Sequence, residues 1–377
     1  KLLHTLRASP CSGHPMLEKF DSLLRSCSCD ITDTQWLQAS LPVRNGGLGI
    51  RRVSSLAPSA FLASAAGTRR LQDEILLNCC ATVDTAVTAV LAHWSAKFGQ
   101  PDVLSPGGEA AGKQREWDKP CVAADVTNLL SRLPDRRSQA RLLALSAPHS
   151  GDWLHAIPIS SCGLRLDNEA VRVAVGLRLG AKLCEPHVCP CGAKVDPEGT
   201  HGLACRRSSG RPTRHHVLND MVWRSLVAAG VPSIKEPAGL LRSDGKRPDG
   251  LTQIPWQSGK CMTWDVTVTD TLAESYLSTT STIAGAAAEG AANRKESKYQ
   301  ALATTHSFIP LAFETLGPIN AKGLSFFNEL GRRLTARSGE PRETQFLFQR
   351  FSIAIQRFNS ICFHGSFLEE AISDHDT

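Results

Sequence analysis

One segment, RPDGLTQIPWQSGKCMTWDVTVTD from Arg247 to Asp270, restricts the possible folds of this chain more than any other. Asp265 lies in its second half, within the run TWDVTVTD, where polar and apolar residues alternate. This alternation is the period of a β-strand that has one polar and one apolar face. Asp249 follows a proline in a Pro-Asp-Gly turn at the start of an earlier strand. We therefore expect the two carboxylates on neighbouring strands of one sheet.

The segments on either side of this pattern predict a helix, three strands, a second helix and a fourth strand. The first helix, HHVLNDMVWRSLVAAG, is amphipathic and ends at Gly230. Strands are expected in SIKEPAGLL, RPDGLTQIPW, CMTWDVTVTD and HSFIPLAFETLG. The second helix is Ala-rich and extends from Ser281 to Thr304, with Ser281 or Thr282 as its N-cap. The sequence therefore predicts an α+β fold.

The first half of the chain is predicted to be mainly helical. Helices are expected at Met16 to Cys27, at Ala57 to Leu91 and at Ala123 to Leu145. Asn45-Gly46-Gly47 is typical of a hairpin turn between two apolar runs. A chain of 377 residues is too long for one ordinary core. We divide it into a helical region at 1–104, a flexible linker at 105–122, a helical linker at 123–182, a cysteine-rich segment at 183–210 and an α/β domain with C-terminal helices at 211–377.

The two carboxylates and a nearby pair of lysines form the first candidate site. Pro-Asp-Gly alone is simply a favourable β-turn, but a carboxylate such as Asp265 in a buried strand is costly unless it is paired or binds a metal. Lys295 and Lys298 share one face of the Ala-rich helix, although a solvated charge run is the ordinary alternative. Two carboxylates that hold Mg²⁺ or Mn²⁺, with a lysine that neutralises developing charge, suit a metal-dependent phosphodiesterase.

From these residues we predict a nuclease site. Asp249 and Asp265 are the predicted metal ligands, and Lys295 or Lys298 is the predicted catalytic lysine. A salt bridge from Asp265 to a basic residue is the structural alternative. Two further acids are available to complete a metal shell: Glu236 and Glu289.

A second constellation lies within VCPCGAKVDPEGTHGLACRR. Three thiolates and one imidazole form a closed tetrahedral zinc site, and we predict the ligands Cys189, Cys191, His201 and Cys205. Cys184 and His187 are alternative ligands in the same segment, and ordinary reduced cysteines are the structural alternative. The chain has thirteen cysteines, an odd number in a long sequence, which favours metal binding or free thiols in a reducing, intracellular compartment over a disulfide framework.

Basic residues crowd the end of the cysteine-rich segment. We predict nucleic-acid contacts from this cluster because cations that track phosphates dominate affinity for DNA, although a solvated surface is the alternative. The formal net charge of +6 suits such a partner, and no apolar run has the length of a membrane span. No P-loop, G-x-S-x-G or C-x-x-C motif is present. The predicted contact residues are Arg206, Arg207, Arg211, Arg214 and His215.

Taken together, these motifs resemble the C-terminal part of the polyprotein of a non-LTR retrotransposon with a restriction-enzyme-like endonuclease, over nearly the whole chain. WLQASLPVRNGGLGIR is similar to the segment after the reverse-transcriptase thumb, and WLHAIPISSCG to the linker before the zinc knuckle. The cysteine-rich segment resembles the C-C-H-C knuckle. RHHVLND, the Pro248-Asp249 turn, WDVTV and the K-x-x-K-Y run that ends at Tyr299 resemble the nuclease motifs of the PD-(D/E)xK type.

The resemblance implies a thumb-like helical region, a zinc knuckle and a restriction-like nuclease domain. It also implies that the chain nicks one strand of a DNA target in the nucleus, and that the freed 3′ end primes copying of the element's RNA by a reverse-transcriptase domain encoded upstream. The sequence contains no Tyr-x-Asp-Asp polymerase motif, so we expect no polymerase site in this chain. The alternative function is a non-catalytic, zinc-containing module that binds nucleic acid and retains a fossil nuclease fold.

Overall fold

A computed structural model of the chain describes residues 2–27, 31–75, 84–100, 111–240 and 245–367. The fold is a mixture of α-helices and two small sheets, which confirms the predicted α+β class. The chain divides into two compact units. Unit 1 contains Lys1–Pro42 and Gly47–Leu133, and unit 2 contains Val43–Gly46 and Pro134–Thr377.

Unit 1 is helical where it is described. A long helix, α4, lies at its centre and packs against α1, α2, α5 and α6, while α3 contacts α6. An aromatic cluster around Trp94 and Trp117 joins α5 and α6 to α4. The bounds of the helices are Leu2–Ala8 (α1), Pro15–Ser26 (α2), Asp33–Ser40 (α3), Val53–Ile75 (α4), Thr85–Phe98 (α5) and Gln114–Arg132 (α6).

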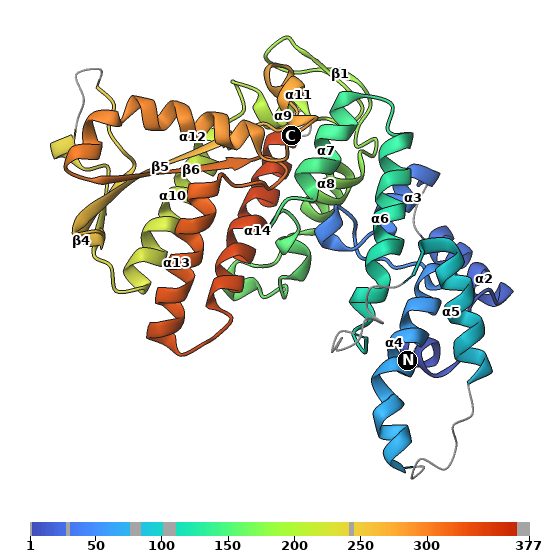
Figure 1. The fold of residues 1–377 in the computed structure, drawn as a ribbon. Coiled ribbons are helices and arrows are strands. Elements are labelled where there is room, and N and C mark those ends of the chain that lie inside the picture. The colour runs from blue at the N-terminus through green and yellow to red at the C-terminus, as the bar shows by residue number, and fades with distance from the viewer. Residues whose placement is uncertain (1, 28–30, 76–83, 101–110, 241–244, 368–377) are drawn as a thin grey trace, which may run out of the picture. The chain divides into compact units, whose positions relative to one another are not determined.

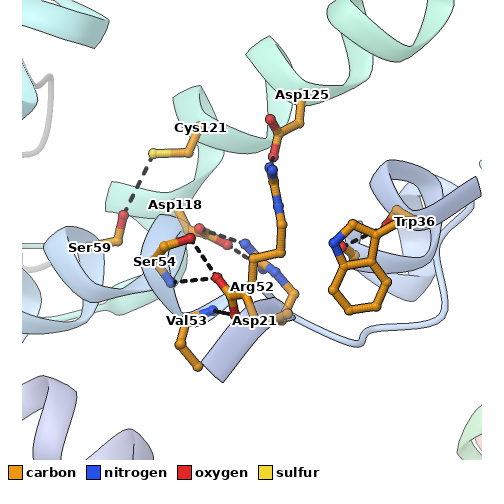
Figure 2. Close-up of polar contacts among 11 residues, drawn as sticks. Asp21, Trp36, Arg52, Val53, Ser54, Ser59, Asp118, Cys121 and Asp125 are labelled. Atoms are coloured by element: carbon orange, nitrogen blue, oxygen red, sulfur yellow. Dashed lines mark hydrogen bonds and ion pairs between the residues drawn. The ribbon is translucent and has the colours of Figure 1, made fainter. Parts of the chain in front are cut away.

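Buried polar contacts fix the start of α4 (Figure 2). The Asp21 carboxylate accepts hydrogen bonds from the backbone N–H groups of Val53 and Ser54, at 2.8 and 3.1 Å. A carboxylate suits this position because the first N–H groups of a helix lack intrahelical partners. Just before α4, Arg51 forms a bidentate ion pair in which it donates to both carboxylate oxygens of Asp118 on α6. Polar side chains therefore set the position of α4 within unit 1.

Unit 2 contains both sheets and a long C-terminal helix, α14, that contacts α8, α9, α10 and α13. Its short 3-10 helices η1, η3, η4, η5 and η6 are Val43–Asn45, Asp152–His155, Ser160–Cys162, Ala238–Leu240 and Gln300–Thr304. Its α-helices are Arg136–Leu145 (α7), Asn168–Leu179 (α8), His201–Ala204 (α9), Gly210–Ala228 (α10), Glu274–Thr280 (α11), Ala286–Lys298 (α12), Ala321–Ser338 (α13) and Glu343–His364 (α14). Its strands are His187–Val188 (β1), Lys194–Val195 (β2), Ser233–Lys235 (β3), Gly250–Gln257 (β4), Lys260–Thr269 (β5) and Ser307–Glu314 (β6).

The larger sheet has the strand order β3-β4-β5-β6. β3 pairs antiparallel with β4, and β4 pairs antiparallel with β5. β6 runs parallel to β5, with Asp265 opposite Pro310 and Thr267 opposite Ala312. The parallel pair requires a crossover, and α11 and α12 provide it. The predicted order of a helix, three strands, a helix and a strand is therefore present as α10, β3, β4, β5, α12 and β6.

Helices cover the two faces of this sheet differently (Figure 1). α10, α13 and α14 pack on one face through large apolar side chains, among them Leu311 and Phe313 of β6. On the other face Ala312 meets the alanines of α12. Small side chains allow a helix and a strand to approach closely, so α12 lies tight against the sheet. Asp265 lies on the face covered by α12. Its register partner on β6 is Pro310, and Ala312 is two positions further along that strand, so the three residues share one face.

Four sequence-based expectations differ from the structure. The single helix predicted at Ala123 to Leu145 is divided between α6, which ends at Arg132, and α7, which begins at Arg136. The flexible linker predicted at 105–122 overlaps α6, which begins at Gln114, and its residues 105–110 lie outside the described part. η1 occupies the predicted hairpin turn, and no strand is present in the described residues 31–75. α12 begins at Ala286 rather than near Ser281, because Gly285 has a φ of 79° and interrupts the helical path.

Candidate functional site

Asp265 lies in the middle of β5 and is the most deeply buried group of the predicted acidic pair. Its side chain is only 5% exposed, and Lys295 Nζ on α12 donates to Asp265 Oδ1 at 2.5 Å. The small alanines of α12 bring the helix close enough for this contact. The structure therefore pairs the buried carboxylate with a lysine, as the structural alternative required, and that lysine is one of the two candidates for catalysis.

Asp249 lies beside Asp265, just before β4. The register pairs Gly250 with Trp264, and Val266 N donates to Asp249 Oδ2 at 2.6 Å, so the Asp249 turn is bound to β5. Only glycine fits at position 250, because a Cβ there would lie 2.0 Å from the Trp264 ring. The two predicted carboxylates are therefore brought together on adjacent segments of one sheet.

Helix α10 supplies two further contacts to the Asp249 turn. His215 Nε2 lies 3.0 Å from Asp249 Oδ2, and Asn219 Nδ2 donates to the Asp249 carbonyl oxygen at 3.4 Å. The two residues are one helical turn apart and share a face of the helix. Asn219 Oδ1 also accepts a hydrogen bond from Trp264 Nε1 at 2.8 Å. Asn219 thus ties the turn to the sheet, and His215 contacts its carboxylate.

The charges in this cluster perturb one another. Burial raises the pKa of Asp265, and the nearby charge of Asp249 raises it further, while Lys295 has the opposite effect. The hydrogen bond to Asp249 raises the pKa of His215. The short contact with Lys295 favours ionised Asp265 but does not overcome burial and acid–acid repulsion. A bound divalent cation would relieve that repulsion, and carboxylate oxygens are ligands that Mg²⁺ accepts.

The second candidate lysine lies one turn further along α12 and has a different partner. Lys298 Nζ donates to the Tyr299 hydroxyl at 2.9 Å and lies 4.5 Å from the centre of the Tyr299 ring. Lys295, in contrast, contacts Asp265 directly. The geometry therefore favours Lys295 as the lysine closest to the acidic pair, with Lys298 beside it.

The two spare acids are engaged elsewhere. Glu236 forms an ion pair with Arg247, and Glu289 Oε1 accepts a hydrogen bond from Ala321 N at 2.5 Å, at the start of α13. Neither contact involves Asp249 or Asp265. The acidic pair is thus supported by His215 and Lys295 rather than by a third carboxylate, among the contacts of the described residues.

The cysteine-rich segment forms a compact cluster of potential metal ligands. The Sγ atoms of Cys189 and Cys205 are 3.7 Å apart, and Cys191 Sγ is 3.2 Å from His201 Nε2. All four ligand atoms lie within 4.8 Å of one another. A tetrahedral site with zinc–sulfur bonds of about 2.3 Å has sulfur atoms about 3.8 Å apart. The residues therefore fit a zinc ion in both chemistry and spacing.

The local fold explains this convergence. β1 and β2 form a hairpin around Cys189 and Cys191, closed by a hydrogen bond from Cys189 N to Ala193 O, and Gly192 has a φ of 90°. Burial raises the pKa of Cys189 to about 11, whereas a hydrogen bond from the backbone of Ala193 lowers that of Cys191 to about 6. Zinc would bind the three cysteines of the cluster as thiolates.

The alternative ligands point to other partners. Cys184 Sγ lies 3.5 Å from the carbonyl oxygen of Asp196. His187 Nε2 lies 3.1 Å from the carbonyl oxygen of Ser366, and its ring stacks on Phe367. Neither residue belongs to the four-residue cluster. The structure thus assembles the ligand set chosen from the sequence.

The predicted basic cluster is divided by the structure. Arg206 and Arg207 are exposed, whereas Arg211 is half-buried and donates to the Ala204 carbonyl oxygen at 3.0 Å. Arg214 is 2% exposed and donates to Asn359 Oδ1, so its prediction as a nucleic-acid contact is wrong. His215 faces Asp249 instead of extending a phosphate-binding surface. The exposed part of the cluster is therefore Arg206 and Arg207.

Two groups of the site were not assigned these roles from the sequence. His215 was grouped with the arginines because it follows them in the chain, and its contact with Asp249 is non-local. Asn219 carried no signal beyond its spacing from His215 on one helix face. Among the described helices, none combines the length and the apolar character that crossing a bilayer requires. Comparisons with protein-family models and with curated proteins gave no match.

Proposed function

We propose that the chain is a Mg²⁺-dependent DNA endonuclease with a restriction-enzyme-like core and a structural zinc knuckle, derived from a non-LTR retrotransposon. In this proposal it nicks a DNA target in the nucleus, and the freed 3′ end primes copying of the element's RNA by an upstream reverse-transcriptase domain. Mn²⁺ would replace Mg²⁺ in the same site. Arg206 and Arg207 would contact nucleic-acid phosphates beside the knuckle.

One observation carries the proposal. A buried carboxylate, Asp265, lies on a central strand, with Asp249 on the adjacent turn and Lys295 in contact with it. This trio joins two acids and one lysine from the start of β4, from β5 and from α12, whereas the PD-(D/E)xK pattern has its lysine two residues after the second acid, where this chain has Thr267. Asp265 and Lys295 meet on the face covered by α12, and the Val266 N–H binds Asp249 beside β5, although the three groups are distant in the sequence.

The residues of the trio have separate roles in this proposal. Asp249 and Asp265 would hold the metal ion, which when bound supplies Lewis-acid activation of a water and of the phosphodiester. Lys295 places positive charge where negative charge develops on the phosphate oxygens during cleavage. His215 and the Val266 N–H orient the Asp249 carboxylate. Asn219 holds the backbone of the same turn.

Nicking of supercoiled plasmid with Mg²⁺ or Mn²⁺ tests the proposal. Asp265→Asn keeps the side-chain volume but removes the charge, and we expect nicking to fall by about a hundredfold or more, while DNA is still retarded in a gel. Asp125→Asn is the matched control, since Asp125 also pairs with a basic side chain, Arg52 at 2.8 Å, but lies in unit 1. Equal rates for Asp265→Asn and the wild type would contradict the proposal.

A second candidate function is non-catalytic binding of nucleic acid. The cysteine–histidine cluster and the exposed Arg206 and Arg207 favour it. In that case the wild type would retard DNA with a strong dependence on salt, because bound counterions are released, yet would not nick it with either metal. Nicking by the wild type and its loss in Asp265→Asn would exclude this candidate.

A further inference from the structure

Tyr299 ends helix α12, which carries both candidate lysines, and its side chain is buried. The residue is 1% exposed. A buried hydroxyl is costly unless it is hydrogen-bonded. Here the hydroxyl donates to the Arg247 carbonyl oxygen at 2.8 Å, and Lys298 Nζ donates to it at 2.9 Å. The buried Tyr299 hydroxyl therefore connects the end of α12 with the Arg247 carbonyl group and with the Lys298 ammonium group.

The loop that Tyr299 contacts is the one that carries Asp249. Arg247 is followed by Pro248, whose ring fixes its own φ, and then by Asp249. Fixing the Arg247 carbonyl group therefore restricts the directions that the Asp249 side chain can take. On the other side of the turn, the Asp249 carbonyl oxygen accepts hydrogen bonds from Glu236 N and Asn219 Nδ2. Tyr299 supplies the support from α12.

The same helix delivers Lys295 to Asp265. The contact between the Tyr299 hydroxyl and the Arg247 carbonyl oxygen therefore links the Asp249 turn to the helix whose Lys295 contacts Asp265. A shift of the Tyr299 hydroxyl would thus move the Asp249 turn relative to α12. Lys298 lies over the Tyr299 ring, where the ring face attracts its ammonium group.

We propose that Tyr299 is a positioning residue of the nuclease site, an inference that rests on the proposed function. Its hydroxyl holds the Asp249 turn against α12, so that Asp249 and Asp265 keep the separation that a divalent cation requires. It also holds the Lys298 ammonium beside the acidic pair, where this cation contacts a phosphate of the bound DNA. Tyr299 itself touches neither the metal nor the substrate.

Tyr299→Phe tests the first part, because the ring and its packing on Phe308 at 4.8 Å are kept. We expect the variant to bind Mn²⁺ about tenfold more weakly, measured from the free Mn²⁺ signal by electron paramagnetic resonance with the zinc site filled. Plasmid nicking should fall by a similar factor at limiting Mn²⁺. Tyr276→Phe is the matched control: the only other tyrosine has an exposed hydroxyl that accepts from Arg294, and its loss should change neither measurement.

Lys298→Met tests the second part without disturbing the core. We expect weaker binding of DNA, by about fivefold for a lost phosphate contact, with unchanged Mn²⁺ affinity. If a folded Tyr299→Phe variant binds Mn²⁺ and nicks plasmid as the wild type does, the positioning role of Tyr299 is overturned. If Lys298→Met leaves DNA affinity unchanged, the role of Lys298 as a phosphate contact is overturned. A wild type that binds no Mn²⁺ and nicks no DNA overturns the proposed function, and this inference with it.

Discussion

At the scale of single residues, Glu329 shows how charge supports the sheet away from the site. Its carboxylate on α13 accepts from Arg332 and Arg333, and Arg333 also donates to the Trp256 carbonyl oxygen and lies 3.8 Å from the centre of the Trp256 ring. The hydrogen bond from Arg332 is the main reason why the pKa of Glu329 falls from its ordinary 4.5 to about 2. The carboxylate thus joins α13 to the end of β4.

This shift predicts a dependence of stability on pH. A carboxyl group whose pKa is lowered by folding stabilises the folded state above its unfolded pKa, and that contribution is lost as pH falls from 4.5 towards 2. Glu329→Gln should therefore cost about 1 kcal/mol at pH 7, since solvent screens a partly exposed pair, and almost nothing near pH 2. Urea unfolding at both pH values measures the difference. Glu274→Gln, at an exposed glutamate of α11, is the control. A cost for Glu329→Gln that does not vary with pH would contradict the linkage.

The acidic pair shows what single residues reveal in a sequence. Asp265 was identifiable because it places a charge in a strand that otherwise looks buried, and such a group needs a partner. The choice of Lys295 over Lys298 could not be predicted from the sequence, because both lysines share one helix face. Only the packing of α12 determines which lysine reaches β5. The burial of Arg214 also depends on a distant residue, Asn359 on α14. Non-local partners leave no local pattern.

At the scale of elements, α9 packs very closely against α14. A Cβ at Gly202 would lie 2.5 Å from the Cys362 carbonyl oxygen, and one at Gly199 would lie 2.2 Å from the Phe363 ring. Backbone cannot move aside as a flexible side chain can. The knuckle is therefore fitted directly onto α14, and a methyl group at this contact would force the two apart.

Gly202→Ala should accordingly destabilise unit 2 by about 1–3 kcal/mol through overpacking. Denaturant unfolding of this variant against Gly239→Ala makes the comparison, since a Cβ at Gly239 meets no atom within 4 Å. Equal stability of the two variants would show that α9 is not held against α14 as the structure has it.

The elements themselves were easier to predict than their ends. The alternation of polar and apolar residues predicted β5, and the helical spacing of apolar residues predicted α10. Both patterns arise because one face of the element is buried. The end of α10 before Gly230, whose φ is 77°, was also visible. The start of α12 was missed because Ser281 and Thr282 look like N-caps, yet α11 ends there and the chain turns at Gly285 first.

At the scale of the whole molecule, the cysteine cluster and the sheet of unit 2 share one core helix. Leu203, between two of the zinc-ligand candidates, packs with Leu272 and Phe363. Further along α14, Phe351 packs on Phe313 of β6. Helix α14 thus connects the cysteine cluster to β6, which pairs with β5, the strand that carries Asp265. Zinc, where bound, would stabilise this helix and not the small hairpin alone.

Loss of zinc should therefore lower the melting temperature of unit 2 as a whole. Structural zinc in small sites contributes about 10 kcal/mol or more to folding, and each kilocalorie corresponds to roughly 2–4 °C in a unit of this size. We expect Cys205→Ser, or a strong chelator, to lower the melting temperature by more than about 10 °C in a single transition, and to abolish retention of zinc. Cys162→Ser, at an exposed cysteine outside the cluster, is the control. A separate early transition with the sheet unaffected would mean that the knuckle unfolds independently of α14.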